Sequence, residues 1–331
     1  MNPRLSDLVS ASRVVSIPLR TKFRGITERE LLVFEGPNGF SEWAAFPEYS
    51  DEEAATWLAA AIEWGYGNLP TPKRTSVPVN AILPAVAPQD VAKILTRVGK
   101  FRTVKIKTAE KGQVIADDLA RILEAQSLYP EAKIRLDANG GFNIAQAMEL
   151  LEKLSFEGIE LEYFEQPVAT IAELAEMKIE ISKTGQTTLI AADESVRKSS
   201  DPLAVELAGA ADILVLKSAP LGGIASALQI AASSKLPIVP SSAMQSSIGL
   251  SAELHFTACL DELTFDAGLG TMNLFAGDLV TDSLKPVDGV LEVRRPEVST
   301  TALETLKAED HRYDWWIARL QRCGRLIGLE A

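Results

Sequence analysis

Short apolar runs rich in β-forming residues alternate with helical segments from about residue 76 onward, and this alternation constrains the fold more than any other feature. The runs occupy eight segments: residues 77–82, 103–107, 133–137, 161–165, 188–193, 212–217, 237–242 and 263–268. Between them lie segments such as 117–128 and 144–154, whose apolar residues recur every three or four positions, as in amphipathic helices. Eight strands separated by helices predict a parallel sheet, and eight is the number of strands that closes a (β/α) barrel.

The segments outside this alternation follow other patterns. Residues 12–21 and 28–46 are typical of antiparallel strands, and a Gly-Pro-Asn-Gly sequence supplies the turn within the second segment. A serine followed by an acidic first turn then predicts an amphipathic helix over residues 50–65. The tryptophan-bearing helix expected at residues 311–327 has no place in a barrel, so we expect the C-terminal tail to pack on the N-terminal portion.

The charge balance limits the partners that the chain can have. Lys and Arg number 33 against 45 Asp and Glu, which gives a formal net charge of −12. That balance opposes a nucleic-acid or anionic-membrane surface, because either would need a basic face. A small anionic substrate would need local cations or a metal ion to offset the negative charge of the protein. With no signal peptide, no long apolar run, and two isolated cysteines, Cys259 and Cys323, the sequence favours a cytoplasmic location.

Charged residues stand at the carboxyl ends of five consecutive predicted strands. They are Lys105, Lys107, Asp137, Glu165, Asp193 and Lys217. In a (β/α) barrel these strand ends meet on one face, where active sites lie, so the six side chains are expected side by side on one rim. The alternation in Thr-Val-Lys-Ile-Lys-Thr over residues 103–108 places both lysines of that strand on the same side.

Three carboxylates on neighbouring strands cannot all ionise in a dry pocket without a cation. Each of Asp137, Glu165 and Asp193 taken alone is more typical of a turn residue or helix cap, but their common spacing favours a shared site. Oxygen ligands with no neighbouring His or Cys predict Mg²⁺. A metal flanked by lysines suits removal of a proton from the carbon next to a carboxylate.

This order of residues resembles the enolase superfamily, in its muconate-lactonizing subgroup, whose pattern is Lys-x-Lys followed by Asp, Glu and Asp and then Lys. The resemblance covers nearly the whole chain and implies a TIM-like (β/α)7β barrel at residues 76–280. It also implies an α+β capping domain formed by residues 1–75 and the C-terminal tail, residues 281–331. Several segments are most similar to the actinobacterial o-succinylbenzoate synthases, among them LDANGGF, EYFEQPVATIAELAE, AADESVRK and DILVLKSAPLGG.

The resemblance implies roles for the rim residues. Mg²⁺, for which Mn²⁺ is an expected substitute, would be held by the three carboxylates. Lys107 would remove the α-proton of 2-succinyl-6-hydroxy-2,4-cyclohexadiene-1-carboxylate and return a proton to the departing hydroxyl, a syn dehydration that gives o-succinylbenzoate for menaquinone biosynthesis. Lys105 would keep the pKa of Lys107 low and help to bind the carboxylate. Lys217 would stabilise the enediolate electrostatically from across the barrel, and its ammonium group would also face the developing aromatic ring.

Other residues are candidates for substrate contacts. Small residues and backbone N–H groups after the seventh and eighth predicted strands suit the succinyl carboxylate, although ordinary loop structure would also explain them. Arg24, in the predicted capping domain, is either a specificity contact or a solvated arginine, and Asn139 either braces Asp137 or suits the turn before Gly140. The set comprises Arg24, Asn139, Ser241, Ser242, Gly268 and Leu269.

Two other functions use the same residues. Racemisation of N-succinylamino acids or epimerisation of dipeptides would employ Lys107 and Lys217 as bases on opposite faces of the substrate. A non-catalytic metal- or ligand-binding barrel would predict that at least one of the six rim residues is replaced, and none is. The sequence leaves the oligomeric state open.

Overall fold

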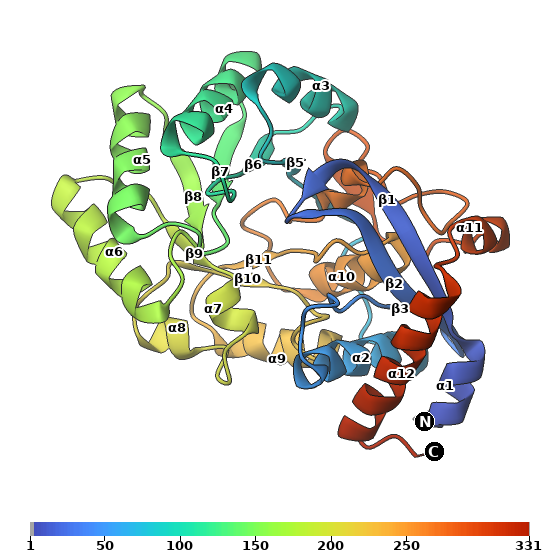
Figure 1. The fold of residues 1–331 in the computed structure, drawn as a ribbon. Helices are drawn as coiled ribbons and strands as arrows, with labels where there is room; N and C mark the ends of the chain where they lie inside the picture. The colour runs from blue at the N-terminus through green and yellow to red at the C-terminus, as the bar shows by residue number, and fades with distance from the viewer. Residues whose placement is uncertain (1–2, 331) are drawn as a thin grey trace.

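A seven-stranded parallel sheet curls into most of a barrel in the computed structural model, which describes residues 3–330 (Figure 1). Its strands run in the order β11 to β5 from one edge to the other. They are β5 (Ala81–Leu83), β6 (Thr103–Lys107), β7 (Lys133–Asp137), β8 (Leu161–Glu165), β9 (Ile190–Ala192), β10 (Ile213–Leu216) and β11 (Ile238–Pro240). The predicted barrel architecture is confirmed.

The two edge strands of this sheet are joined by the segment predicted as the eighth strand. Ala267 bridges to Val79 before β5, and Gly268 bridges to Ser241 after β11, both in parallel orientation. Backbone hydrogen bonds support each bridge, from Gly268 N to Pro240 O at 2.8 Å and from Asn80 N to Ala267 O at 3.0 Å. The strand expected at 263–268 is therefore reduced to two isolated bridges. One residue pairs with each edge of the sheet, and the 3₁₀ helix η1 (Gly270–Leu274) begins soon afterwards.

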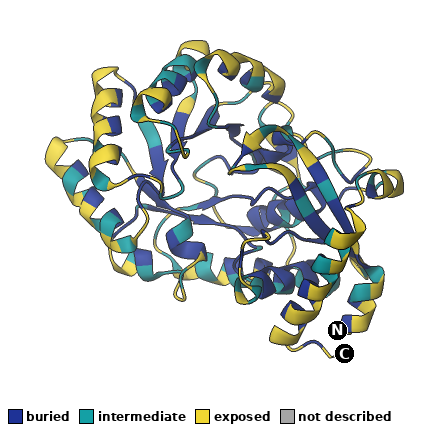
Figure 2. Ribbon diagram, in the orientation of Figure 1, coloured by how far each residue is buried: buried dark blue, intermediate teal, exposed yellow. Residues whose placement is uncertain are grey.

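Helices cover the outer face of the sheet, with apolar faces inward and exposed faces outward (Figure 2). In α5, the buried residues Ala147, Leu150, Leu151 and Leu154 follow the spacing of an amphipathic helix. The outer helices are α3 (Pro88–Val98), α4 (Ile115–Leu128), α5 (Ile144–Phe156), α6 (Ile171–Thr184), α8 (Ala204–Leu207) and α9 (Ile224–Ser233). The short helix α7 (Glu194–Arg197) begins at the end of β9, and α10 (Ser247–Cys259) is buried along most of its length and packs against β3. Within residues 3–330, no helix has the length and apolarity that crossing a membrane requires.

The N-terminal portion forms a separate antiparallel sheet, as the sequence predicts. Strands β1 (Arg13–Phe23), β2 (Ile26–Gly36) and β3 (Gly39–Trp43) pair in chain order, after a short helix α1 (Leu5–Ala11). Helix α2 (Asp51–Tyr66) follows, and the Ser50 side chain caps it by accepting a hydrogen bond from Glu53 N at 3.2 Å. At the β2–β3 turn, a Cβ on Gly36 would meet Gly65 O at 2.5 Å, so the close approach of α2 requires glycine there.

The C-terminal tail runs back along both parts of the chain. Strand β12 (Val290–Glu292) pairs with β4 (Ser76–Pro78), which shortens the predicted first barrel strand at 77–82 to β5. After α11 (Thr300–Thr305), helix α12 (Asp310–Leu326) packs against α2, β1 and α1 (Figure 1). Trp316 Nε1 donates to Glu30 Oε2 of β2 at 2.9 Å. The domain boundaries at residues 75 and 280 stay a prediction.

Two buried charged residues of the N-terminal sheet hold the loop between β11 and α10. Glu42 of β3 accepts hydrogen bonds from Ser246 N at 3.2 Å, from Gly249 N at 3.3 Å and from the Ser246 hydroxyl, at the start of α10. Arg29 of β2 donates through Nε to Met244 O at 3.1 Å. Both side chains are buried. They connect the N-terminal sheet to a barrel loop through hydrogen bonds that solvent does not reach.

Replacing Glu42 by alanine should weaken this connection. The Glu42→Ala variant leaves the amides of Ser246 and Gly249 without an acceptor, so we expect the free energy of unfolding to fall by about 2–4 kcal/mol. Urea unfolding of the two proteins measures this difference. The matched control is Glu35→Ala, an exposed glutamate of β2, which should change stability by less than about 0.5 kcal/mol. Equal effects of the two substitutions would contradict the assignment.

Candidate functional site

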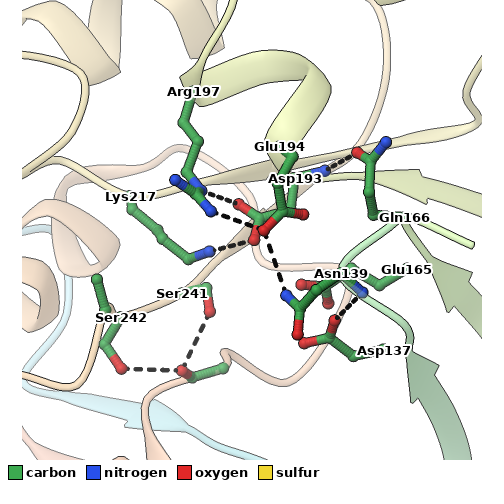
Figure 3. A network of polar contacts seen from close by, with 12 residues as sticks. Asp137, Asn139, Glu165, Gln166, Asp193, Glu194, Arg197, Lys217, Ser241 and Ser242 are labelled. Carbon is green, nitrogen blue, oxygen red and sulfur yellow. Dashed lines mark hydrogen bonds and ion pairs between the residues drawn. The ribbon is translucent and has the colours of Figure 1, made fainter. Parts of the chain in front are cut away.

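The six charged residues predicted at the strand ends lie together on one rim of the barrel. Figure 3 shows four of them: Asp137, Glu165, Asp193 and Lys217. Lys105 and Lys107 belong to β6, Asp137 and Glu165 end β7 and β8, and the remaining two follow β9 and β10. All six are less than one-tenth exposed: Lys105, Lys107, Asp137, Glu165, Asp193 and Lys217. A cluster of charges this deeply buried requires mutual neutralisation, because removing an unpaired ion from water costs several kcal/mol.

The strand register produces this arrangement. Lys107 is the partner of Asp137 in the β6–β7 pair, and Asp137 is the partner of Glu165 in the β7–β8 pair, so the three lie in one row across the sheet. Val104 and Ile106 point the other way into the core beneath the helices. The alternation along β6 therefore places both of its lysines inside the barrel.

Each carboxylate of the rim is paired with a lysine. Lys107 Nζ lies 2.5 Å from Asp137 Oδ2, Lys105 Nζ lies 2.8 Å from Glu165 Oε2, and Lys217 Nζ lies 2.5 Å from Asp193 Oδ2. Lys105 also lies 3.5 Å from Asp137 Oδ2, so Asp137 is placed between both lysines of β6. The pairs come from neighbouring or nearby strands, and the barrel geometry fixes their separation.

The surroundings shift the acidities of these groups in different directions. Burial would raise the pKa of Asp137, but the charges of Lys107 and Lys105 outweigh it and lower the pKa to about 2. Burial, together with the negative charges of Asp137 and Asp193, raises the pKa of Glu165 to about 7. Burial lowers the pKa of Lys107, with the Lys105 ammonium acting in the same direction. A lysine with a lowered pKa is better suited to accept a proton near neutrality.

The donor atoms of the rim fit a hard divalent cation. Within residues 3–330, no three Asp, Glu, His or Cys side chains are grouped so that they could share a metal ion as they stand, because lysine ammonium groups lie between the carboxylates. Asp193 Oδ1 is buried and accepts no hydrogen bond from the described residues, although it lies 3.3 Å from Arg197 Nε in an ion pair. Burial is the main cause of the raised pKa of Glu165, and the negative charges of Asp137 and Asp193 add to it. An all-oxygen set with mutual repulsion is suited to Mg²⁺.

Asn139 and Gln166 brace the carboxylates. Asn139 N donates to Asp137 Oδ1 at 3.2 Å, and its side-chain oxygen accepts from Lys107 Nζ at 2.5 Å. Gln166 Oε1 accepts hydrogen bonds from the amides of Asp193 and Ser195, both at 3.1 Å, and so fixes the start of α7. Gln166 was not predicted from the sequence, since a glutamine directly after a strand has no distinctive pattern.

Arg197 is a second residue that the sequence analysis missed. Its Nε lies 3.3 Å from Asp193 Oδ1, and its Nη2 donates to Glu194 Oε1 at 2.6 Å. Its Nη1 donates to the Tyr49 hydroxyl of the N-terminal portion at 3.3 Å. Asp193 is therefore held between Lys217 and Arg197 (Figure 3). The spacing of four residues between Asp193 and Arg197 was the available signal, because such pairs face each other on a helix.

A pocket opens over the rim and receives side chains from both parts of the chain. Of the residues predicted to contact substrate, Arg24, Asn139, Ser241, Ser242 and Gly268 line it. Leu269 does not, since its side chain is buried in the apolar core. The N-terminal portion adds side chains that the sequence analysis did not predict, because no sequence pattern shows which loops reach across: Phe23, Tyr49 and Trp57.

The two serines are engaged with the segment that closes the barrel. The hydroxyls of Ser241 and Ser242, which lie side by side in Figure 3, donate to Gly268 O at 3.3 and 3.2 Å. Ser242 Oγ also lies 3.1 Å from Thr271 Oγ1. A Cβ on Gly268 would meet Ser241 Oγ at 2.6 Å, so glycine is required for this contact. The serines thus form the wall of the pocket as well as its polar surface.

Family models cover most of the chain. The model described as Enolase C-terminal domain-like matches residues 89–297, and the one described as Enolase N-terminal domain-like matches residues 14–65. Among solved structures, muconate lactonizing enzyme from Pseudomonas fluorescens superposes with a TM-score of 0.74 at 18% identity, covering 90% of this chain and 98% of that one. The L-Ala-D/L-Glu epimerase from Bacillus subtilis gives 0.71 at 20% identity, over 87% and 96% of the two chains. These likenesses establish the fold.

Curated relatives are much more similar in sequence. An o-succinylbenzoate synthase from Mycobacterium ulcerans (strain Agy99) is 45% identical over 323 residues, 98% of this chain and 96% of the relative. One from Mycobacterium tuberculosis (strain ATCC 25618 / H37Rv) is 46% identical over 325 residues, 98% of this chain and 97% of the relative. The chain therefore belongs to the enolase superfamily and, within it, to the family of the o-succinylbenzoate synthases.

Proposed function

We propose that the protein is an o-succinylbenzoate synthase, a lyase that dehydrates 2-succinyl-6-hydroxy-2,4-cyclohexadiene-1-carboxylate to o-succinylbenzoate in menaquinone biosynthesis. The observation that carries the proposal is the rim itself, where three buried lysines and the buried carboxylates of Asp137 and Asp193 line one pocket. The third rim carboxylate, Glu165, is buried beside them and paired with Lys105. Full-length identity of 45–46% to curated synthases supports the choice of reaction.

Lys107 is the proposed base. Its Nζ would remove the proton from the carbon that bears the ring carboxylate and then deliver a proton to the departing hydroxyl on the same face of the ring. The lowered pKa of Lys107, caused by burial and by the Lys105 ammonium, supports this role. Nζ now lies 2.5 Å from Asp137 Oδ2 and 2.5 Å from Asn139 Oδ1, so it must leave these partners before it accepts a proton.

Lys105 and Lys217 are proposed to act as fixed cations. The charges of Glu165 and Asp137 raise the pKa of Lys105 above its usual range in spite of burial, so this side chain stays protonated. Its positive charge in turn lowers the pKa of Lys107. Lys217 approaches the pocket from β10, paired with Asp193. Its ammonium would stabilise the negative charge that develops on the substrate from the side opposite Lys107.

Enolase-superfamily sites generally work with Mg²⁺, and Asp137, Glu165 and Asp193 are the residues proposed to hold it here, with Mn²⁺ as an expected substitute. When bound, the ion would supply Lewis-acid stabilisation of the charge on the substrate carboxylate. Asn139 would orient Asp137 through the 3.2 Å hydrogen bond from its backbone amide. Gln166 would orient Asp193 through its backbone, because Gln166 Oε1 accepts a hydrogen bond from the Asp193 amide.

The remaining predicted substrate residues are proposed to surround the succinyl group. Arg24 lines the pocket from the N-terminal portion, with its guanidinium 4.7 Å above the Phe46 ring, and carries the charge that a second carboxylate needs. Ser241, Ser242 and Gly268 line the same pocket from the barrel. Leu269 is proposed to contribute only through its backbone, because its side chain lies in the core.

Racemisation of N-succinylamino acids is the second candidate function. Lys107 and Lys217 both line the pocket from different strands, β6 and the end of β10, as a reaction with a base on each face of the substrate would require. The dehydration needs a base on one face only. The two functions therefore differ in what Lys217 does, and isotope exchange separates them.

The Lys107→Ala variant should lose the dehydration activity. Removing the proposed base is expected to lower kcat by about 10²–10⁴-fold or more, the range typical of general acid–base groups. The measurement is a continuous assay of the cyclohexadiene substrate, with near-ultraviolet circular dichroism to check the fold. Substantial dehydration by this variant would be incompatible with the proposed mechanism.

Removal of divalent metal should abolish activity reversibly. Treatment with EDTA is expected to stop dehydration, and added Mg²⁺ should restore it. Mg²⁺ binding measured by calorimetry gives a readout that does not depend on turnover. The Asp193→Asn variant should bind the ion at least about tenfold more weakly, because an ionised oxygen donor is lost. The exposed Asp282→Asn substitution is the control and should leave affinity unchanged.

Isotope exchange distinguishes the two candidate functions. N-succinylamino acids incubated with the enzyme in deuterated water should exchange their α-proton slowly or not at all, compared with the rate at which the cyclohexadiene substrate is dehydrated. Mass spectrometry and nuclear magnetic resonance follow the exchange. Rapid exchange without any dehydration would favour the racemase and reject the synthase. A Lys217→Ala variant that keeps exchange on one enantiomer alone would identify Lys107 as the base for that face.

A further inference from the structure

A groove adjoins the pocket on the side of Lys107. It runs between the end of β1 with the following turn, residues 21–24, and the loop after β6, residues 108–113. The groove and the pocket share Phe23, Arg24, Lys107 and Asn139. The Phe23 ring centroid lies 5.4 Å from Lys107 Nζ, at the junction of the two spaces. The groove therefore leads from solvent toward the proposed base.

The groove carries a positive charge that is opposite in sign to the chain as a whole. Lys22, Arg24, Lys107 and Lys111 line it, and Glu110 is the only carboxylate among its described lining residues. Lys22, Arg24 and Lys111 form no salt bridge with any residue of the range 3–330, and Lys22 and Lys111 are exposed. Unpaired cations in a concave surface raise the local potential, even on a protein whose formal charge is −12.

A buried polar atom in the groove points to a polar ligand as well. Thr108, directly after Lys107, lines the groove and is only 4% exposed, yet its Oγ1 has no hydrogen-bond partner among the described residues. A buried hydroxyl without a partner costs free energy unless a ligand or water satisfies it. A carboxylate passing along the groove could accept this hydrogen bond.

We propose that this groove is the access route of the anionic substrate, and that Lys22, Arg24 and Lys111 steer the substrate toward Lys107. The inference rests on the proposed function for the identity of the anion, a dicarboxylate. A cluster of like-charged side chains at the mouth of a low-dielectric cleft increases the local concentration of an oppositely charged ligand, and salt weakens the effect. Lys22 and Lys111 lie outside the pocket itself, so their contribution is electrostatic.

Charge reversal at the groove tests the proposal. In the Lys22→Glu/Lys111→Glu double variant, we expect kcat/KM at low salt to fall about tenfold with kcat within about twofold of wild type, because the potential acts on substrate capture. The difference should shrink to about twofold near 1 M NaCl, where the Debye length is about 3 Å. The matched control is Lys93→Glu/Arg97→Glu on the exposed surface of α3, which makes the same charge change and should alter kcat/KM by less than about twofold.

Binding of o-succinylbenzoate, measured by calorimetry over the same salt range, extends the test beyond turnover. Weaker binding by the groove variant than by the control variant, with a shallower salt dependence, would support steering. Equal kcat/KM, equal affinity or an unchanged salt slope would overturn it, as would absence of binding to the wild-type protein. A wild-type protein that binds the dianion with the expected salt dependence but dehydrates nothing would reject the proposed function and leave the steering supported.

Discussion

The structure depends on the mutual neutralisation of charges inside the barrel. Three lysines and three carboxylates are less than one-tenth exposed, and none could remain ionised there alone. The pairing of β6 with β7 and of β7 with β8 fixes Lys107, Asp137 and Glu165 in one row. A shift of register by one residue would turn these side chains toward the helices and leave them without partners, so the rim also specifies the register.

The N-terminal sheet contributes to the site through contacts that reach over the rim. Glu42 and Arg29 hold the loop before α10, which carries Ser242 and Met244 in the wall of the pocket. Arg197 donates to the Tyr49 hydroxyl while it pairs with Asp193. A change in the position of the N-terminal sheet relative to the barrel would therefore alter the wall of the pocket and the surroundings of Asp193, one of the proposed metal ligands.

The rim could be predicted from sequence because parallel strands end on the same side of a sheet. Asp137 and Lys217 needed only the recognition of their strands. The length of the eighth strand was overestimated, because the apolar pattern of residues 263–268 resembles that of a full strand. In the structure only Ala267 and Gly268 pair with the sheet, each through a single bridge. The side chain of Leu269, just before η1, lies in the core and not in the pocket, and its contact with substrate stays a prediction.

Other site residues could not be predicted because they depend on contacts between distant segments. Tyr49 and Trp57 lie in the pocket only because α2 and the loop before it pack over the barrel, and aromatic residues there are also what an ordinary core requires. The pairing of every rim carboxylate with a lysine was likewise beyond the sequence. Strand-end positions give proximity within one rim, but which of several neighbouring charges pair depends on side-chain lengths and on the curvature of the sheet.

Charge balance connects the architecture of the site to the kind of substrate proposed for it. Lys105, Lys107, Lys217 and Arg197 face four carboxylates, those of Asp137, Glu165, Asp193 and Glu194, so the buried cluster is close to neutral. A divalent cation alone would leave it with an excess of two positive charges, and a dicarboxylate alone with two negative ones. Binding both restores neutrality, so each should strengthen the binding of the other. The groove can therefore be positive while the buried cluster is close to neutral: the groove would attract the dianion, and the cluster would accept it together with its counter-charge.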